Sequence, residues 1–193
     1  MNFTSIATLL SAFGLSASAG LNAYIPLLIV ALVGRFAPSV LRLSAPWDGM
    51  TSWWVIGTLA VLTLIEILAD KIPLVDHAND VLGTVVRPAA GAVLFAATTG
   101  TVSYLDPNVA LILGLFVAGA AHGAKATARP IVTATTGGIG NPIVSTVEDI
   151  VSLFTSLLAI FVPIVIGLAA AVFLLVLVVW RAGRRDGAVA GRA

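Results

Sequence analysis

Apolar residues run in long uninterrupted stretches along this chain, and charged residues are confined to short segments between them. Five stretches carry no charge at all: residues 3–34, 49–65, 88–105, 107–121 and 150–180. A helix needs about 20 residues to cross the apolar core of a bilayer. The second, third and fourth stretches, extended slightly at their ends, therefore each predict one membrane helix.

The first and last stretches are longer than one crossing requires, at about 46–48 Å each if they are continuous helices. Gly14, Gly20 and Pro26 interrupt the first stretch, and Pro163 and Gly167 interrupt the last. Each stretch is therefore either one tilted or kinked span or a broken or re-entrant helix. The pattern predicts an all-α polytopic membrane protein with about five spans.

Composition supports this class of protein. Hydrophobic residues make up 59% of the 193 residues and charged residues 10%, whereas a soluble domain carries about 25% charged residues. We expect one transmembrane domain over residues 1–180 and a short, basic, disordered cytoplasmic tail over residues 181–193. The net charge of +1 argues against a nucleic-acid partner, and the absence of cysteine excludes disulfides and thiolate metal sites.

Arginines predict the orientation. Arg35 and Arg42 follow the first stretch, and four more arginines follow the last. Five spans place both groups on one face, which the positive-inside rule makes cytoplasmic. We therefore expect a multi-pass protein of the bacterial cytoplasmic (inner) membrane, with the N-terminus outside and the C-terminus inside. Four tryptophans mark the inner interface: Trp47, Trp53, Trp54 and Trp180.

Two ten-residue segments, 73–82 and 142–151, resemble each other, with Pro, Val and Asp at the same offsets. Each predicts a helix start, because proline and then acidic residues are typical of a first helical turn. Two spans separate the copies, so both enter the membrane from the same side as a parallel repeat. We expect one site built from both halves, with four acids as binding residues: Asp76, Asp80, Glu148 and Asp149.

Polar residues follow the first copy at helical spacing. Asp76, Asp80, Thr84 and Arg87 lie at i, i+4, i+8 and i+11, which places them on one helix face. This stripe is either solvated at the interface or lines a cavity. Ionisable groups at membrane depth are costly and mostly functional, which favours the cavity for Arg87.

Two further acids precede the first copy. Glu66 follows an apolar run, and Asp70 comes one turn later, near the predicted outer boundary. Glu66 and Asp70 are each a candidate proton carrier or ion-pair partner, and the candidate partners of Glu66 are Lys125 and Arg129 on a neighbouring helix. We favour the ion pair.

A basic group lies later in the chain, where His122, Lys125 and Arg129 are spaced about one turn apart. Like charges on one helix face repel, so anionic groups should lie opposite them. The acids of the two repeat copies are the first candidates. A phosphate or carboxylate substrate is the alternative, because Arg and Lys are common partners of both.

The first stretch contains Asn22 and Tyr24 between Gly20 and Pro26. We expect local unwinding there, with these side chains either lining a pore or joining helices together with small residues such as Ser18.

Asn141 ends a glycine-rich segment that leads into the second repeat copy, and we expect it, like Asn22, Tyr24 and Pro26, to line a pore or mark a helix break. We interpret this segment as an ordinary connector, because it lacks the pattern of a nucleotide-binding loop.

Three motifs together resemble a family of small bacterial membrane proteins known mainly as a domain of unknown function. They are Gly20-x-Asn22-Ala23-Tyr24-x-Pro26; Asp70-Lys71-Ile72-Pro73 with Asp76, Asp80, Thr84, Arg87, Pro88 and Gly91; and Gly140-Asn141-Pro142 with Ser145, Glu148 and Asp149. The resemblance extends from Ser5 to about Trp180. It implies a polytopic membrane protein with these residues as its signature, and it implies no established activity.

These observations favour a small transporter or a protein that translocates a lipid or anion. We expect it to work as a homo-oligomer among membrane lipids, with bases holding an anionic substrate while an acid or histidine exchanges a proton. The alternatives are a divalent cation transporter, with the acids as ligands, and a non-transporting scaffold whose charges form internal ion pairs. We do not expect an enzyme or a cofactor, because no nucleophile–base pair is visible.

Overall fold

The computed structural model describes residues 3–43, 45–100 and 105–162, together with residues 169, 172, 173 and 176; the side chains at positions 3, 4, 73, 74, 76 and 77 are outside the description. The described part is all-helical. It contains α1 (Phe3–Leu21), α2 (Tyr24–Phe36), the short 3-10 helix η1 (Trp47–Thr51), α3 (Trp53–Ala69), α4 (Pro73–Thr99), α5 (Pro107–Thr136) and α6 (Asn141–Phe161). The predicted tail and Trp180 lie outside the described residues.

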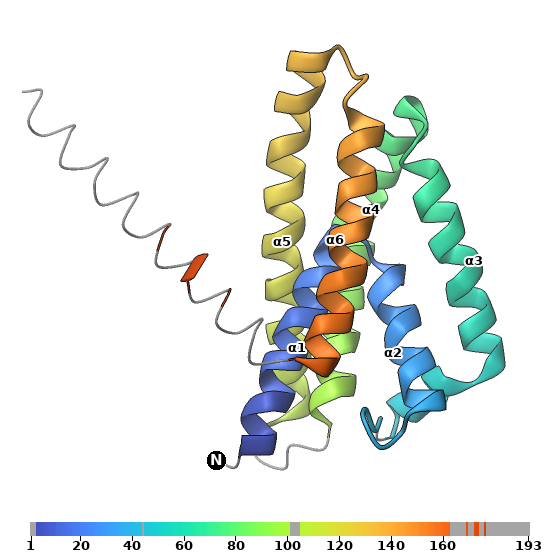
Figure 1. Ribbon diagram of the computed structural model, residues 1–193, viewed down its shortest axis with the longest axis vertical. Coiled ribbons are helices and arrows are strands. Elements are labelled where there is room, and N and C mark those ends of the chain that lie inside the picture. The colour runs from blue at the N-terminus through green and yellow to red at the C-terminus, as the bar shows by residue number, and fades with distance from the viewer. Residues whose placement is uncertain are drawn as a thin grey trace, which may run out of the picture.

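The first apolar stretch is broken into two antiparallel helices. Figure 1 shows α1 rising from the N-terminus to about mid-height and α2 descending again. The break occurs at Asn22, whose Oδ1 accepts hydrogen bonds from the backbone N–H groups of Tyr24 and Ile25. Pro26 lies in the first turn of α2, where its missing N–H is not needed. Of the alternatives that the sequence left open for the first stretch, the broken or re-entrant helix is the one observed.

This hairpin corrects the predicted orientation. A cavity of about 280 Å³ is lined by Ala7 and Thr8 from the start of α1 and by Arg42 from the segment after α2. The N-terminus therefore lies at the same end of the molecule as Arg42, which we call the lower end. This differs from the expected placement of the N-terminus opposite Arg42, because the first stretch returns to the side from which it starts; which end faces which side of the membrane stays a prediction.

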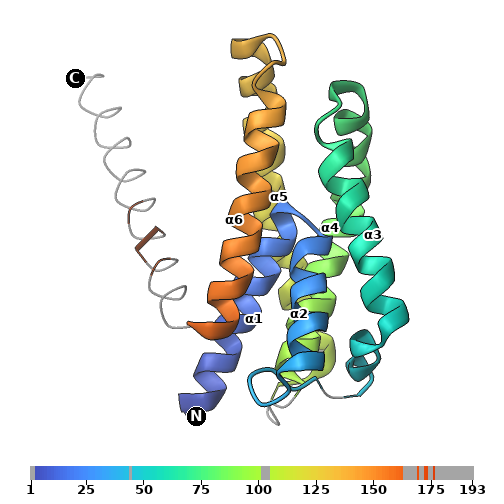
Figure 2. The same cartoon turned by 45° about the vertical axis from the view of Figure 1, so that its right-hand side comes forward.

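Helices α3 to α6 run alternately up and down beside the hairpin (Figures 1 and 2). Both α4 and α6 begin at the upper end, where residues 137–140 join α5 to α6, so the two repeat copies do start helices on the same side. The last apolar stretch is not one continuous helix, since α6 ends at Phe161.

The helices are longer than the uncharged stretches suggested. With 27 and 30 residues, α4 and α5 reach about 40 and 45 Å. Both continue through an internal proline, Pro88 in α4 and Pro130 in α5. Their charged residues therefore lie within helices and not in the loops between them.

Small residues let α1, α4 and α5 approach closely. A Cβ added to Gly91 would lie 2.8 Å from the carbonyl oxygen of Gly114 and would also collide with the Ala118 side chain. A Cβ added to Gly20 would lie 2.6 Å from that of Ala121. Packing through glycine and alanine is the usual way in which membrane helices associate.

Serine hydroxyls join α1 to α6 and α4. Ser18 is fully buried, and its Oγ lies 2.9 Å from Ser152 Oγ and 2.7 Å from Ser156 Oγ. Ser16 donates to the Gly91 carbonyl at 2.9 Å. These serines form hydrogen bonds between helices, which is the helix-joining role that the sequence offered as the alternative to pore lining.

Large apolar side chains cover the outside of the bundle. Trp54, Ile139 and Val85 are 89%, 82% and 73% exposed. Three helical segments are long and apolar enough to cross a membrane: Ala78–Thr99, Pro107–Thr136 and Asn141–Phe161. Shorter apolar helices accompany them: Ser5–Leu21, Tyr24–Phe36 and Trp53–Ala69. The fold is that of a polytopic helical membrane protein.

Candidate functional site

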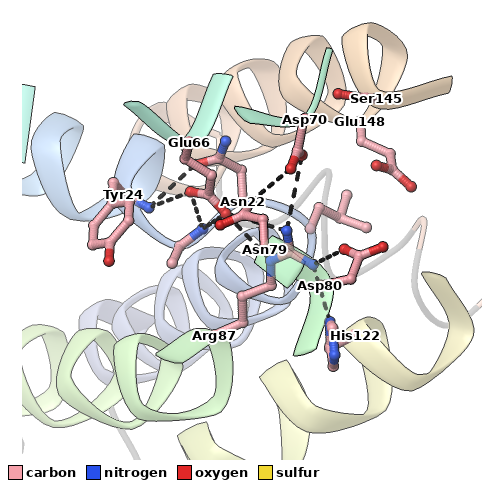
Figure 3. A network of polar contacts seen from close by, with 12 residues as sticks. Asn22, Tyr24, Glu66, Asp70, Asn79, Asp80, Arg87, His122, Ser145 and Glu148 are labelled. Atoms are coloured by element: carbon pink, nitrogen blue, oxygen red, sulfur yellow. Dashed lines mark hydrogen bonds and ion pairs between the residues drawn. The ribbon is translucent and has the colours of Figure 1, made fainter. Parts of the chain in front are cut away.

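Charged side chains from α3 to α6 gather around the tip of the α1–α2 hairpin, and Figure 3 shows part of this group from close by. We call the group the charge network. It comprises Glu66, Asp70, Lys71, Asp80, Arg87, Lys125, Arg129, Glu148 and Asp149.

Arg87 on α4 is the most deeply buried member, with a fully buried side chain. Its Nε and Nη2 donate to Glu66 Oε1 at 3.3 and 3.2 Å, and its Nη1 donates to Asp80 Oδ1 at 3.0 Å. An arginine in this position holds carboxylates from α3 and α4 together. The guanidinium is the residue type best suited to a buried pairing with several partners.

Opposite charges hold the two helix ends at the hairpin tip. The Glu66 carboxylate accepts from the backbone N–H groups of Ala23 at 3.1 Å and Tyr24 at 3.4 Å, at the positive end of the α2 dipole. Lys125 Nζ donates to the Leu21 carbonyl at 3.1 Å, at the negative end of α1. The polar backbone that a re-entrant turn brings into the protein interior is thus satisfied by side chains of α3 and α5.

The second repeat copy supplies acids to the same group. Glu148 Oε2 lies 2.9 Å from Lys125 Nζ and 2.8 Å from Arg129 Nη2. Arg129 also contacts Asp80 at 3.3 Å. Carboxylates from both copies therefore share Lys125 and Arg129, as the two-half site predicted.

Asp149 points to the hairpin side of the network. Its Oδ1 accepts from Asn22 Nδ2 at 2.9 Å, and its Oδ2 pairs with Lys71 Nζ at 3.1 Å. Lys71 Nζ also donates to Ser145 Oγ at 2.8 Å. The Asn22 side chain therefore accepts from the first N–H groups of α2 and also joins the helix break to α6 through Asp149.

His122 connects Arg87 to Thr84. Arg87 Nη1 lies 3.2 Å from His122 Nδ1, and Thr84 Oγ1 lies 3.3 Å from His122 Nε2. Because a guanidinium can only donate, this contact assigns the acceptor role to Nδ1 and leaves Nε2 facing the Thr84 hydroxyl.

The network opens into a cavity of about 790 Å³ between the upper parts of α4 and α5 and the start of α6. Asp80, His122 and Arg129 contribute its ionisable lining groups, and Asn141 lines it from α6. The Asn141 amide oxygen accepts from Thr133 Oγ1 at 3.1 Å. This upper cavity therefore presents an acid, a base and a histidine from two helices.

The sequence predicted most members of the group. Six of the eight predicted binding residues lie in the ion-pair network, and His122 contacts it: Asp80, Arg87, His122, Lys125, Arg129, Glu148 and Asp149. Glu66, Asp70 and Asn22 join it as well. Tyr24 contributes its backbone N–H, and Pro26 is buried in α2. The side chain of Asp76 lies outside the description.

One predicted pairing was wrong. Glu66 pairs with Arg87 and not with Lys125 or Arg129, which take Glu148 as their close partner. The reason is the position of Glu66 along α3. Glu66 lies at the level of the hairpin tip, where Arg87 from the adjacent α4 reaches it first.

Three polar residues belong to the site without having been proposed as binding residues. Lys71 pairs with Asp149, Asn79 donates to Asp70 Oδ1 at 2.6 Å, and Ser145 accepts from Lys71. Each lies in or directly before a repeat copy. Their position in or directly before a repeat copy was the sequence feature that could have identified them.

The predicted divalent-cation alternative lacks a matching cluster. Among the described residues, no group of three or more His, Asp or Glu side chains is arranged to hold a metal ion. The network acids lie instead within contact distance of Lys and Arg.

The chain matches the family model of a domain of unknown function, DUF4126, over residues 9–182. It belongs to this family of polytopic helical proteins. No curated protein and no solved structure matches the chain. The function must therefore be argued from the charge network and its cavity.

Proposed function

We propose that this protein is a small membrane transporter that moves an anion together with a proton through the upper cavity. One observation carries the proposal: a buried network of mixed charge lies at the tip of a re-entrant hairpin and reaches the cavity through Asp80, His122 and Arg129. Broken helices that meet ionisable groups inside the membrane are typical of substrate sites in secondary transporters.

Arg129 is the proposed anion-binding group. It lines the cavity and shares Asp80 and Glu148 with Lys125, which lies directly behind it. A phosphate or carboxylate that enters the cavity can take the place of the Asp80 carboxylate on the guanidinium, since both offer oxygens in the same geometry.

Asp80 is the proposed proton-exchanging group, with His122 next to it. The Asp80 side chain is 20% exposed, against 1% for that of Asp70. Protonation of Asp80 removes its negative charge and weakens its ion pair with Arg129, so that this arginine can bind the substrate. His122, which lines the same cavity, is the alternative proton-exchanging group.

Charge balance supports coupling between the two ions. The network contains five acids and four bases among the described side chains, so its formal charge is −1. A proton brings it to zero, and a monovalent anion returns it to −1. Joint entry therefore leaves the buried charge unchanged, which avoids the high cost of adding an unpaired ion at membrane depth.

We further propose that the lower end, with Arg35 and Arg42, faces the cytoplasm of a bacterial cell, following the positive-inside rule. The upper cavity then opens on the outer side. The small size of the bundle favours assembly of more than one copy in the membrane.

The test uses purified full-length protein in liposomes that contain a pH-sensitive dye. Outside additions of inorganic phosphate, lactate or succinate are the probes. We expect at least one of them to drive internal acidification in the wild type, and Asp80→Asn to lower that rate at least about tenfold, because a fixed amide cannot exchange a proton. Asp48→Asn, which removes an exposed acid of η1, is the matched control and should transport normally.

A scaffold held by internal ion pairs is the second candidate. The observation in its favour is that each acid of the network lies within 4 Å of a base. It predicts no acidification with any of the probes, together with a lower melting temperature for Asp80→Asn. Acidification that is lost in Asp80→Asn but retained in Asp48→Asn contradicts it.

A further inference from the structure

A second cavity, of about 280 Å³, lies at the lower end, away from the charge network. Four segments meet around it: the start of α1, the connection after α2, and the ends of α4 and α6. Its lining residues are Ala7, Thr8, Ser11, Pro38, Ser39, Val40, Leu41, Arg42, Thr98 and Ile160. We call it the lower cavity.

Thr98 gives the lower cavity a buried polar group that the protein itself does not satisfy. The residue is only 3% exposed, and its Oγ1 has no hydrogen-bond partner among the residues that the structure describes. Its neighbour Thr99 is equally buried, but Thr99 Oγ1 donates to the Phe95 carbonyl at 2.7 Å. Buried hydroxyls are nearly always paired, so the Thr98 hydroxyl points to a ligand.

Arg42 is a positively charged residue that lines the lower cavity. No ion-pair partner of Arg42 is found in the part of the chain that the structure describes, whereas Arg35 nearby stacks over the Trp53 ring at 4.3 Å and donates to the Thr51 carbonyl. No acid belongs to the described part of the lining. The lower cavity therefore favours an anion, in contrast to the upper cavity, where Asp80 faces Arg129.

We propose that the lower cavity binds a phosphate group, with Arg42 and the Thr98 hydroxyl as donors. Arginine and hydroxyl groups together are a standard set of phosphate donors. Two sources offer this chemistry: the head group of an anionic phospholipid and free phosphate.

The surroundings fit a lipid head group. Trp47 and Leu9 pack against the same core cluster, and Trp54, at the lower end, is 89% exposed. Tryptophans gather at the level where phospholipid phosphates lie. Val40 and Ile160 give the lower cavity an apolar wall against which a glycerol backbone can pack.

The experiment measures thermal unfolding of purified full-length protein in a non-ionic detergent. One arm adds inorganic phosphate, with sodium chloride at equal ionic strength as its control. The other arm adds dihexanoyl phosphatidylglycerol, with dihexanoyl phosphatidylcholine as its control. We expect a rise of the melting temperature by several degrees with at least one phosphate probe, since a ligand that binds the folded state stabilises it. A rise with the lipid alone assigns the site to head groups, and a rise with inorganic phosphate assigns it to free phosphate.

Two variants test whether the shift in melting temperature arises from binding in the lower cavity. Arg42→Gln should weaken the apparent affinity about tenfold or more, and Thr98→Val about threefold or more, because each removes one donor. The matched controls Arg35→Gln and Thr99→Val should bind as the wild type does. Thr98→Val should not lower the melting temperature without ligand, because the hydroxyl has no bond to lose.

Three results overturn the proposal. They are a shift with both phosphate probes no larger than that with sodium chloride or phosphatidylcholine, an unchanged shift in Arg42→Gln, or equal affinity of Thr98→Val and the wild type. These results are independent of the proposed transport. The lower cavity shares no residue with the charge network, so loss of phosphate binding in Arg42→Gln leaves the liposome test of Asp80 unaffected.

Discussion

At the scale of single residues, Arg87 holds the interior of this protein together. Its guanidinium contacts Glu66, Asp80 and His122, which come from three helices. Because the side chain is fully buried, any loss of its charge leaves carboxylates without compensation in a site of low polarity. Buried ion pairs add little net stability when complete, yet breaking one is expensive.

Replacing Arg87 by methionine should lower the free energy of unfolding by about 3–5 kcal/mol, the usual cost of an uncompensated buried charge. Thermal or denaturant unfolding in detergent measures this. The double variant Arg87→Met with Glu66→Gln should recover part of the loss, since the unpaired charge is then removed.

Arg35→Gln is the control for Arg87→Met, because this exposed arginine contacts Trp53 and Thr51 at the lower end. It should change stability by less than about 1 kcal/mol, as surface substitutions do. Equal effects of the two variants would contradict the central role of Arg87.

At the scale of helices, the re-entrant hairpin depends on close packing behind it. Gly20 on α1, Gly91 on α4 and Gly114 on α5 leave no room for a Cβ, and Ala118 fills the space between them. This contact keeps the hairpin tip at the level of the network. Loss of the contact would separate the tip from Glu66 and Lys125.

Gly91→Ala should destabilise the protein by about 1–3 kcal/mol, because the added methyl group meets backbone and not a flexible side chain. Gly57→Ala on α3 is the matched control, since a Cβ there meets nothing within 4 Å. It should be neutral or stabilise by about 0.5–1 kcal/mol through helix propensity. Melting temperatures of the two variants in one detergent test both statements, and a stable Gly91→Ala would show that the helices can separate freely.

At the scale of the whole molecule, the hairpin puts the N-terminus, Arg35 and Arg42 at one end and the α5–α6 turn at the other (Figure 2). The natural chain contains no cysteine. Single cysteines therefore report directly on which end faces which compartment.

Ser39→Cys and an N-terminal tag should be accessible from the same side of the membrane, and Ile139→Cys from the other. A membrane-impermeant maleimide applied to sealed vesicles, with an antibody against the tag, measures this. Labelling of Ser39→Cys and Ile139→Cys from the same side would contradict the arrangement of the helices.

The class of fold was predictable from the sequence because apolar stretches of membrane length have few other uses. Both helix starts of the repeat were predictable because proline suits a first turn, and α4 and α6 begin at Pro73 and Asn141. The expected acids are absent from the first turn of α6, since Glu148 and Asp149 lie further along the helix. The gathering of charges was predictable for a similar reason. An unpaired charge inside the membrane is costly, so the few ionisable residues of the membrane helices were expected to pair with one another.

The pairing inside the site and the path of the first stretch were not predictable. An apolar stretch has the same composition whether it crosses the membrane or turns back, and only Asn22 marks the turn. The choice of Arg87 as the partner of Glu66 depends on how far α3 and α4 are offset along their axes. That offset is set by packing between helices and leaves no local pattern.

The hairpin also has a consequence for the order of synthesis. Its tip is translated long before the groups that hold it: Glu66 follows Ala23 by 43 residues, and Lys125 follows Leu21 by 104. Until α3 and α5 emerge from the ribosome, the Ala23 N–H group and the Leu21 carbonyl lack the side chains that satisfy them in the folded protein. We therefore expect the hairpin to take its final place only after most of the chain has been made.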